Sequence, residues 1–198
     1  DRYECRHGLG YSRINGELGG IDVSVTCFVP LGQTCEVWDV RLTNHTDASR
    51  DITLFSFVEW CLWDALDDMT NFQRNFSTGQ VEVEDDAIFH VTEYRERRNH
   101  FGYFACNRPV DGFDTARNAF VGVHNGLDAP TAVVDGHCTG SIAHGWHPIG
   151  AHEIALSLKP GETQRLHFLL GYAENPPAEK FTAPGVANKA PYRAVAGR

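Results

Sequence analysis

The stretch IDVSVTCFV, residues 21–29, decides the fold class, because apolar and polar side chains alternate along it. In an extended chain, successive side chains point to opposite faces. Its odd-numbered residues are all apolar and would share one face, while Asp22, Ser24 and Thr26 would share the other. Pro30-Leu31-Gly32 then ends the strand. The alternation predicts a half-buried β-strand and not a helix.

The same period of two recurs along most of the chain. It predicts strands at residues 38–42, 81–84, 88–91, 154–158 and 166–170, and apolar runs predict two more at 101–106 and 120–123. Residues 52–60 are apolar on both faces, which is typical of a strand covered on both sides. Residues 107–118, with Pro109 and Gly112, are predicted to form a long connection. The pattern indicates an all-β protein.

Size and charge limit the possible functions. The 198 residues suffice for one large domain with a sizeable core. The 26 acidic and 17 basic residues give a formal charge of −9, which argues against nucleic acid and anionic membranes as partners. No apolar stretch reaches the roughly 18 to 20 residues that a membrane-spanning helix needs. We expect a soluble protein.

The six cysteines indicate a reducing compartment. They are scattered singly through apolar patterns, without a CxxC pair or a disulfide-like spacing. We therefore expect reduced core cysteines, a cytoplasmic protein, and no disulfide or zinc site. The chain opens at Asp1 without a Met, as a fragment or a processed product would.

Residues 60–77 combine aromatic and polar side chains in an unusual way. The stretch WCLWDALDDMTNFQRNFS holds two tryptophans, three aspartates, amides and Arg74. Aromatic faces together with carboxylates, amides and a guanidinium suit a polyhydroxylated ligand such as a sugar. The alternative is an irregular connection that covers one end of a sheet, with Trp60 and Trp63 in the core and the acids solvated.

Two other stretches suggest sites that we do not favour. Residues 137–148 hold three histidines and Cys138, but His144 and His147 stand three apart in a glycine-rich loop and no carboxylate completes a metal set. We therefore predict no metal site there, and histidines that hydrogen-bond to the backbone. Residues 93–100 are mixed in charge, which favours an ion-paired edge or an interface over a nucleic-acid patch.

The alternation stops after Glu174. Residues 175–198 carry four prolines and many Ala, Lys and Gly. We expect a linker without regular structure that leads to a further domain.

Six short sequence words spread through the chain carry a resemblance to a known family. They are RHGLGYSRI at 6–14, FVPLG at 28–32, LFSFVE at 54–59, NFQRN at 71–75, TEYRERR at 92–98 and GYAENP at 171–176. Taken together and in this order, they resemble the N-terminal β-sandwich domain of the disaccharide phosphorylases of glycoside hydrolase family 94, to which cellobiose phosphorylase belongs.

The resemblance implies a fold and a domain plan. It implies a large two-sheet antiparallel β-sandwich, the galactose-mutarotase-like supersandwich, over residues 1–174 and lacking its first strands. Residues 175–198 would be the linker to an (α/α)-barrel catalytic domain that is absent from this chain. Missing strands would leave an open sheet edge.

The resemblance also implies an activity for the whole enzyme. Such enzymes convert cellobiose and phosphate to α-glucose 1-phosphate and glucose with inversion, using one general acid, and inorganic phosphate is the co-substrate in place of any cofactor. The acid and the phosphate site would lie in the barrel, so no residue of this chain is predicted to be catalytic. The resemblance further implies a homodimer in which the sandwich of one subunit lends a loop to the sugar pocket of the other subunit. The matching positions here are Asn71, Gln73, Arg74 and Asn75, with Asp64 and Asp68 upstream.

Two functions follow as alternatives. In the first, the chain is a non-catalytic part of a cytoplasmic disaccharide phosphorylase, supplying dimer contacts and one wall of the active site. In the second, it is an autonomous carbohydrate-binding sandwich. The disaccharide itself stays open among cellobiose, chitobiose, cellodextrins, laminaribiose and cellobionic acid.

Overall fold

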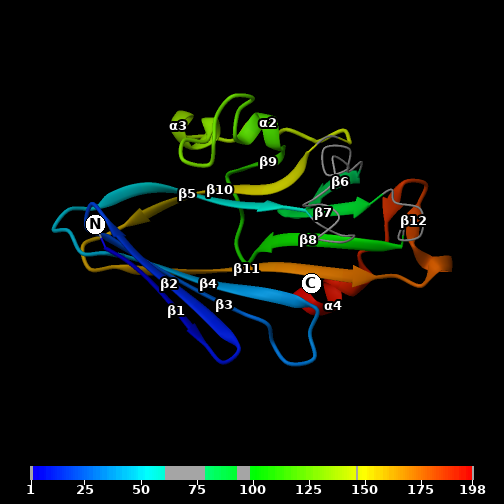
Figure 1. The fold of residues 1–198 in the computed structure, drawn as a ribbon, viewed down its shortest axis with the longest axis horizontal. Helices are drawn as coiled ribbons and strands as arrows, with labels where there is room; N and C mark the ends of the chain where they lie inside the picture. Colours follow the sequence, from blue (N-terminus) through cyan, green and yellow to red (C-terminus); the bar gives the residue numbers. More distant parts are fainter. Residues whose placement is uncertain (1, 61–78, 93–98, 146, 198) are drawn as a thin grey trace.

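The computed structural model describes residues 2–60, 79–92, 99–145 and 147–197, and these residues form two antiparallel sheets packed face to face (Figure 1). Every strand pair is antiparallel, so the predicted all-β sandwich is confirmed. The strands are β1 Arg2–Gly8, β2 Tyr11–Leu18, β3 Ile21–Phe28, β4 Cys35–Asn44, β5 Arg50–Glu59, β6 Gly79–Glu84, β7 Ala87–Thr92, β8 His100–Cys106, β9 Gly112–Ala116, β10 Pro148–Leu158, β11 Thr163–Glu174, β12 Phe181–Ala183 and β13 Val186–Ala187.

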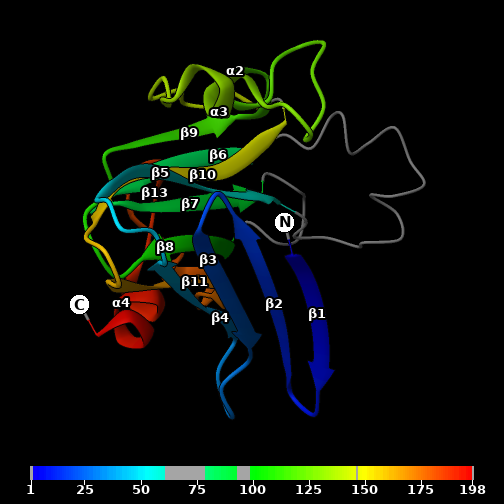
Figure 2. The same cartoon turned by 90° about the vertical axis from the view of Figure 1, so that its left-hand side faces the viewer.

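The large sheet has the strand order β1-β2-β3-β4-β11-β8-β7-β6, and the small sheet has the order β5-β10-β9. Strand β11 is inserted between β4 and β8, so segments far apart in sequence become neighbours. Figure 2 shows β1 and β2 at one side of the molecule and the C-terminal helix at the other. The chain therefore places its N-terminal strands at the free end of the large sheet.

The alternation of β3 continues across the large sheet because the strands pair in register. Val25 lies opposite Val40, and Val40 lies opposite Leu166. These side chains form the inner face, which we define as the face turned toward the small sheet. The main core lies between the sheets, where Phe104, Phe168 and Leu158 are almost fully buried. The opposite face of the large sheet, the outer face, is polar over β2 to β4, as the predicted face of Asp22, Ser24 and Thr26 requires.

The C-terminal segment packs on the outer face at the other end of the sheet. It forms a 3-10 turn at Pro177–Glu179, the β12-β13 hairpin and helix α4 at Ala190–Ala196. Tyr192 of α4 is buried and its ring lies 4.9 Å from that of Phe89 and 5.0 Å from that of Tyr103. The prediction that residues 175–198 lack regular structure is wrong, because apolar side chains among the prolines dock on the sheet.

Lys189 strengthens this docking. Its Nζ lies 2.6 Å from Glu82 Oε2 and 3.1 Å from Glu84 Oε2, and its side chain is only 3% exposed. A buried ammonium persists when it is paired and hydrogen-bonded. Composition alone classed this lysine as part of a solvated linker.

Two short helices cover the face of the small sheet that points away from the core. Helix α2 spans Arg117–Phe120 and α3 spans Thr131–Asp135. Phe120 stacks on Phe57 with ring centroids 5.4 Å apart. The predicted strand at residues 120–123 is therefore wrong. Its buried apolar side chains lie at the end of helix α2 and pack on the small sheet. The predicted connection at residues 107–118 contains strand β9, which pairs with β10.

Contrary to the prediction, the described cysteines are not all core residues. Cys35 and Cys106 are buried, whereas Cys5 is exposed on β1. In the described part of the chain, no helix is both long and apolar enough to cross a bilayer.

Candidate functional site

The six residues with a predicted substrate-binding role all fall between Trp60 and Gly79. Asp64, Asp68, Asn71, Gln73, Arg74 and Asn75 lie outside the described residues. The described residues at the two ends of this stretch therefore locate the candidate site.

The two ends meet at one buried ring. Trp60 follows β5 and stacks on His90 of β7, with ring centroids 5.7 Å apart and planes 11° apart. Gly79, the first residue of β6, lies against the same imidazole, because a Cβ atom at Gly79 would lie 1.9 Å from His90 Nε2. The chain thus leaves the small sheet and rejoins the large sheet at the same place.

His90 acts here as a packing group. It is 3% exposed, and among the described residues neither ring nitrogen has a hydrogen-bond partner. Burial lowers the pKa of His90 to about 4, since the charged imidazolium is poorly solvated there. At neutral pH the ring is uncharged, so it supports Trp60 and does not serve as a general acid.

Gly79→Ala should disturb this junction, because its methyl group would overlap the His90 ring. We expect a loss of about 1–3 kcal/mol in the free energy of unfolding, measured by urea denaturation. Gly16→Ala is the control, since its Cβ would have one neighbour at 3.8 Å. If the steric account holds, His90→Ala and Gly79→Ala will be non-additive in the double variant. Additive losses would contradict it.

A pocket of about 500 Å³ opens beside Trp60 at this end of the sandwich. Glu36 reaches it from the inner face of β4 and accepts a hydrogen bond from Trp38 Nε1 at 2.5 Å. Tyr172 of β11 contributes a second aromatic ring to the wall, and Thr34 Oγ1 donates to its carbonyl at 2.7 Å. The lining residues are Val29, Gln33, Thr34, Cys35, Glu36, Glu59, Trp60, Gly102, Leu170, Gly171 and Tyr172.

This lining combines aromatic rings with carboxylate and amide groups, which is the composition that polyhydroxylated ligands require. Neither Glu36 nor Tyr172 is among the site residues predicted from the sequence. One signal in the sequence could have indicated the site. Glu36 is a carboxylate on the same strand face as the apolar residues Trp38, Val40 and Leu42.

The described end of the run of mixed charge at residues 93–100 lies beside the same pocket, because His100 contacts Tyr172. Residues 93–98 lie outside the described residues. His100, at the start of β8, contacts the Tyr172 hydroxyl, and its Nε2 lies 3.3 Å from Glu174 Oε1. The Asn99 side chain donates to the Asn175 carbonyl at 2.7 Å. These contacts tie the end of the run to β11, beside the pocket.

The loop that suggested a metal site is held by a carboxylate. Asp114 Oδ1 accepts hydrogen bonds from Thr139 Oγ1 at 2.7 Å and from Ser141 Oγ at 2.6 Å. His137 Nδ1 lies 3.1 Å from a backbone carbonyl, as predicted for a loop histidine. Burial raises the pKa of Cys138 to about 12, with Asp114 and Glu153 adding to the shift, so the thiol is unreactive. No cluster of three or more metal-binding side chains occurs among the described residues.

Comparison with protein families assigns this fold. Residues 1–184 match the supersandwich domain of glycosyl hydrolase 94. The chain belongs to glycosyl hydrolase family 94. The family resemblance carried by the six sequence words is therefore confirmed.

Relatives of this family 94 chain include two phosphorylases. Solabiose phosphorylase of Paenibacillus borealis is 35% identical over 194 residues, which cover 93% of this chain and 25% of that enzyme. N,N'-diacetylchitobiose phosphorylase of Vibrio furnissii is 32% identical over 170 residues, covering 85% of this chain and 21% of that enzyme. The chain spans about a quarter of the length of these relatives.

Among solved structures, a GalM/aldose epimerase homologue from C. elegans superposes with a TM-score of 0.51 at 10% identity, covering 89% of this chain and 70% of that one. At this identity the likeness concerns the fold alone. It supports the predicted galactose-mutarotase-like sandwich.

Proposed function

We propose that this chain is the non-catalytic N-terminal part of an inverting disaccharide phosphorylase, with cellobiose as the substrate. The observation that carries the proposal is the match to the family 94 supersandwich over residues 1–184, joined to relatives that are phosphorylases. The relatives act on different disaccharides, so cellobiose is the part of the proposal that most needs a direct test.

The proposed reaction exchanges one bond at the sugar's anomeric carbon. An oxygen of inorganic phosphate bonds to C1 from one face while the glycosidic bond from C1 to the leaving oxygen breaks on the other. A general acid transfers its proton to that oxygen, which leaves as a hydroxyl of free glucose. We assign the acid and the phosphate site to an (α/α)-barrel domain that follows this chain, and no catalytic role to the sandwich.

The sandwich has a positional role in this proposal. Its residues 61–78 would form a wall of the sugar pocket, with Arg74, Asn71, Gln73 and Asn75 holding acceptor hydroxyls, and Asp64 and Asp68 beside them. The support is geometric, since both ends of that stretch are fixed at the Trp60–His90 stack next to the Glu36 pocket. We further propose a homodimer in which this wall faces the partner's barrel. The free cysteines suit a cytoplasmic enzyme.

Arg74→Ala in the full-length enzyme should weaken acceptor use more than folding. A guanidinium that donates to sugar hydroxyls contributes a charge-assisted hydrogen bond, so the acceptor KM in the synthetic direction should rise about tenfold or more. The assay is phosphate release from α-glucose 1-phosphate and glucose. Arg108→Ala removes the same charge from a residue bonded to Gln164, and should leave the KM unchanged. An unchanged acceptor KM for Arg74→Ala with a lowered melting temperature would make Arg74 structural.

The same assay tests the substrate. Phosphate release from α-glucose 1-phosphate with glucose, and little release from the N-acetylglucosamine analogues of both sugars, is the expected result. Activity only with the N-acetyl sugars would assign a chitobiose specificity instead. No phosphate release with any pair, together with measurable sugar binding, would favour the carbohydrate-binding module.

A further inference from the structure

The outer face of the large sheet carries an ordered array of polar side chains over β2, β3, β4 and β11. The strand register aligns them in rows, because Arg13 lies opposite Thr26, which lies opposite Asp39, and Asp39 lies opposite His167. A second row, two residues along the strands, runs Asn15, Ser24, Arg41, Arg165. The polar half of each strand's alternation therefore builds one continuous surface.

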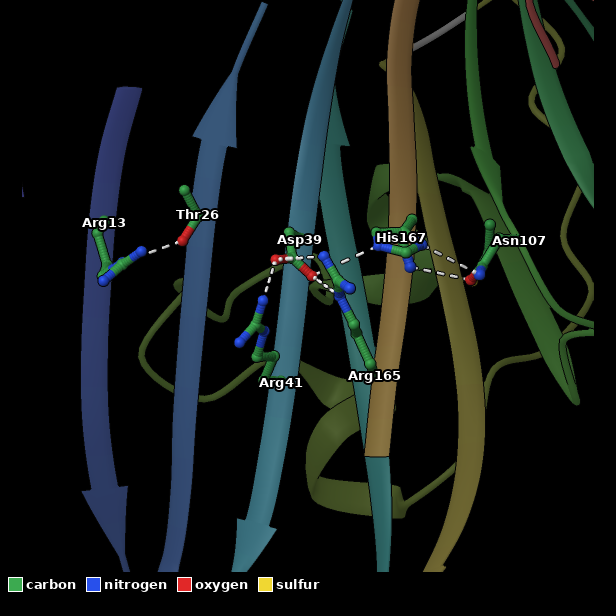
Figure 3. Close-up of polar contacts among 8 residues, drawn as sticks. Arg13, Thr26, Asp39, Arg41, Asn107, Arg165 and His167 are labelled. Carbon is green, nitrogen blue, oxygen red and sulfur yellow. Dashed lines mark hydrogen bonds and ion pairs between the residues drawn. The ribbon is translucent and has the colours of Figure 1, made fainter. Parts of the chain in front are cut away.

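Figure 3 shows how these side chains contact one another across the strands. Arg13 Nε donates to Thr26 Oγ1 at 3.2 Å. Asp39 accepts from Arg165 Nε at 2.5 Å and from Arg41 Nη2 at 3.2 Å. His167 Nε2 lies 3.4 Å from Asp39 Oδ1. One carboxylate thus serves two guanidinium groups.

A groove of about 360 Å³ is hollowed into this face. The lining combines short residues such as Ser24 and Gly16 with three long arginines. Its lining residues are Arg2, Arg13, Asn15, Gly16, Asp22, Val23, Ser24, Thr26, Arg41, Thr43 and Thr163. The volume falls within the roughly 300–1,000 Å³ of small-molecule sites.

The groove is positively charged on a chain whose net charge is −9. Its lining holds three arginines and one aspartate. Among the described residues Arg13 has no carboxylate partner, and Arg2 Nη2 lies 3.7 Å from Asp22, beyond hydrogen-bond distance. The side chains of Arg2 and Arg41 remain 65% and 54% exposed. The guanidinium of Arg13 is therefore available to a ligand, and so are the exposed N–H groups of Arg2 and Arg41 that their ion pairs with Asp22 and Asp39 leave unused.

The chemistry of these groups selects one kind of ligand. Guanidinium groups match the oxygens of phosphate and carboxylate, often two bonds at a time. The hydroxyls of Ser24 and Thr43 and the amide of Asn15 both donate and accept, as sugar hydroxyls require. The lining lacks an aromatic ring on which a neutral sugar would stack.

We propose that this groove binds a sugar that carries an oxyanion, with the phosphate or carboxylate group held by Arg13 and Arg41. The ring hydroxyls then face Asn15, Ser24 and Thr43. The groove lies on the outer face, whereas the Trp60 pocket opens from the inner face, so this site does not depend on the proposed phosphorylase function.

Arginine labelling in the full-length enzyme tests the site directly. Phenylglyoxal modification is followed by peptide mass mapping, with α-glucose 1-phosphate, glucuronate or glucose present, and with NaCl at matched ionic strength. We expect the first two to slow modification of Arg13 and Arg41 about tenfold at saturation, and glucose and NaCl to have little effect. Arg108 is the internal control, since it bonds to Gln164 outside the groove. Stronger protection by one ligand identifies phosphate or carboxylate as the preferred oxyanion.

Binding by the variants completes the test. In calorimetric titration with the better ligand, Arg13→Ala and Arg41→Ala should each weaken the groove site about tenfold or abolish it, while the catalytic site and the Arg108→Ala variant keep their affinity. Equal protection of all three arginines, or protection by NaCl alone, would overturn the proposal. If the full-length enzyme binds the ligand in the groove but shows no phosphorolysis, the proposed function is wrong and the proposed groove site still stands.

Discussion

Phe104→Ala is expected to lower the free energy of unfolding by about 3–5 kcal/mol, the usual cost of removing a large aromatic ring from a closed core. Phe104 is fully buried on β8. Its ring stacks on Phe168 at 5.5 Å, meets Trp38 edge-on at 5.4 Å, and lies 4.9 Å from His152. Three of these residues belong to the large sheet and His152 belongs to the small one, so one ring holds the two sheets together.

Urea denaturation followed by tryptophan fluorescence measures this loss, and Trp38, one of the four tryptophans, lies in the cluster. Phe181→Ala is the matched control, because Phe181 is 40% exposed and should cost well under half as much. Similar losses for both variants would mean that the intersheet cluster is not the stabilising core. A changed m-value would point instead to an altered unfolded state.

The strands were predictable because the burial of one face imposes a period of two on the sequence. Residues 21–29 and 154–158 show the period; β3 covers the first stretch except for its last residue, and β10 contains the second. The insertion of β11 between β4 and β8 was not predictable, since the pairing of β11 with β4 joins residues more than one hundred apart and leaves no local signal. Tertiary packing also overrode the local strand pattern at Phe120. The apolar run there begins in helix α2, which covers the small sheet.

The candidate site was predictable only in part. The sequence words shared with the family located the predicted sugar-binding stretch. The Glu36 pocket and the outer-face groove were not predictable, because the pairing register of distant strands brings their residues together. Arg13 and Arg41 are 28 residues apart, and their common face follows from the pairing of β2 with β3 and of β3 with β4. A polar residue on the solvent side of a strand carries no signal of a binding site, because most such residues are only solvated. The excess of three arginines over one aspartate in the groove becomes visible only when the strands are assembled into the sheet.

Acidification from pH 6.5 to 4 should destabilise the sandwich through two buried histidines. Burial lowers the pKa values of His90 and His152 to about 4 in the folded protein, against 6.5 for an unperturbed histidine. Between these pH values the unfolded chain binds protons that the folded chain does not. Each histidine therefore contributes stability that is present above pH 6.5 and is lost as the pH falls, at about 1.4 kcal/mol per pH unit.

Above about pH 5 this window separates the histidines from the carboxylates, since a hydrogen bond from Arg193 lowers the pKa of Glu84 from its ordinary value of 4.5 and that contribution is lost only below pH 5. Hydrogen bonds from Arg165 keep the pKa of Asp39 below its usual range, so the stability from that ion pair is lost only at lower pH, below about 4. Unfolding free energies measured by urea titration at several pH values should thus fall steadily from pH 6.5 to 4 and then fall further. A flat profile above pH 4 would contradict burial of the two imidazoles as uncharged rings.

His152→Gln isolates one of the two contributions. His152 is fully buried and its Nδ1 lies 3.1 Å from Ser56 Oγ, a contact that a glutamine amide is able to replace. The variant should be less stable at neutral pH, but its loss of stability per pH unit between 6.5 and 4 should be about half that of the parent protein. His137→Gln, at an exposed loop position, should keep the full slope. Because the slope counts protons, a halved value identifies His152 as a titrating group even if the substitution also disturbs packing.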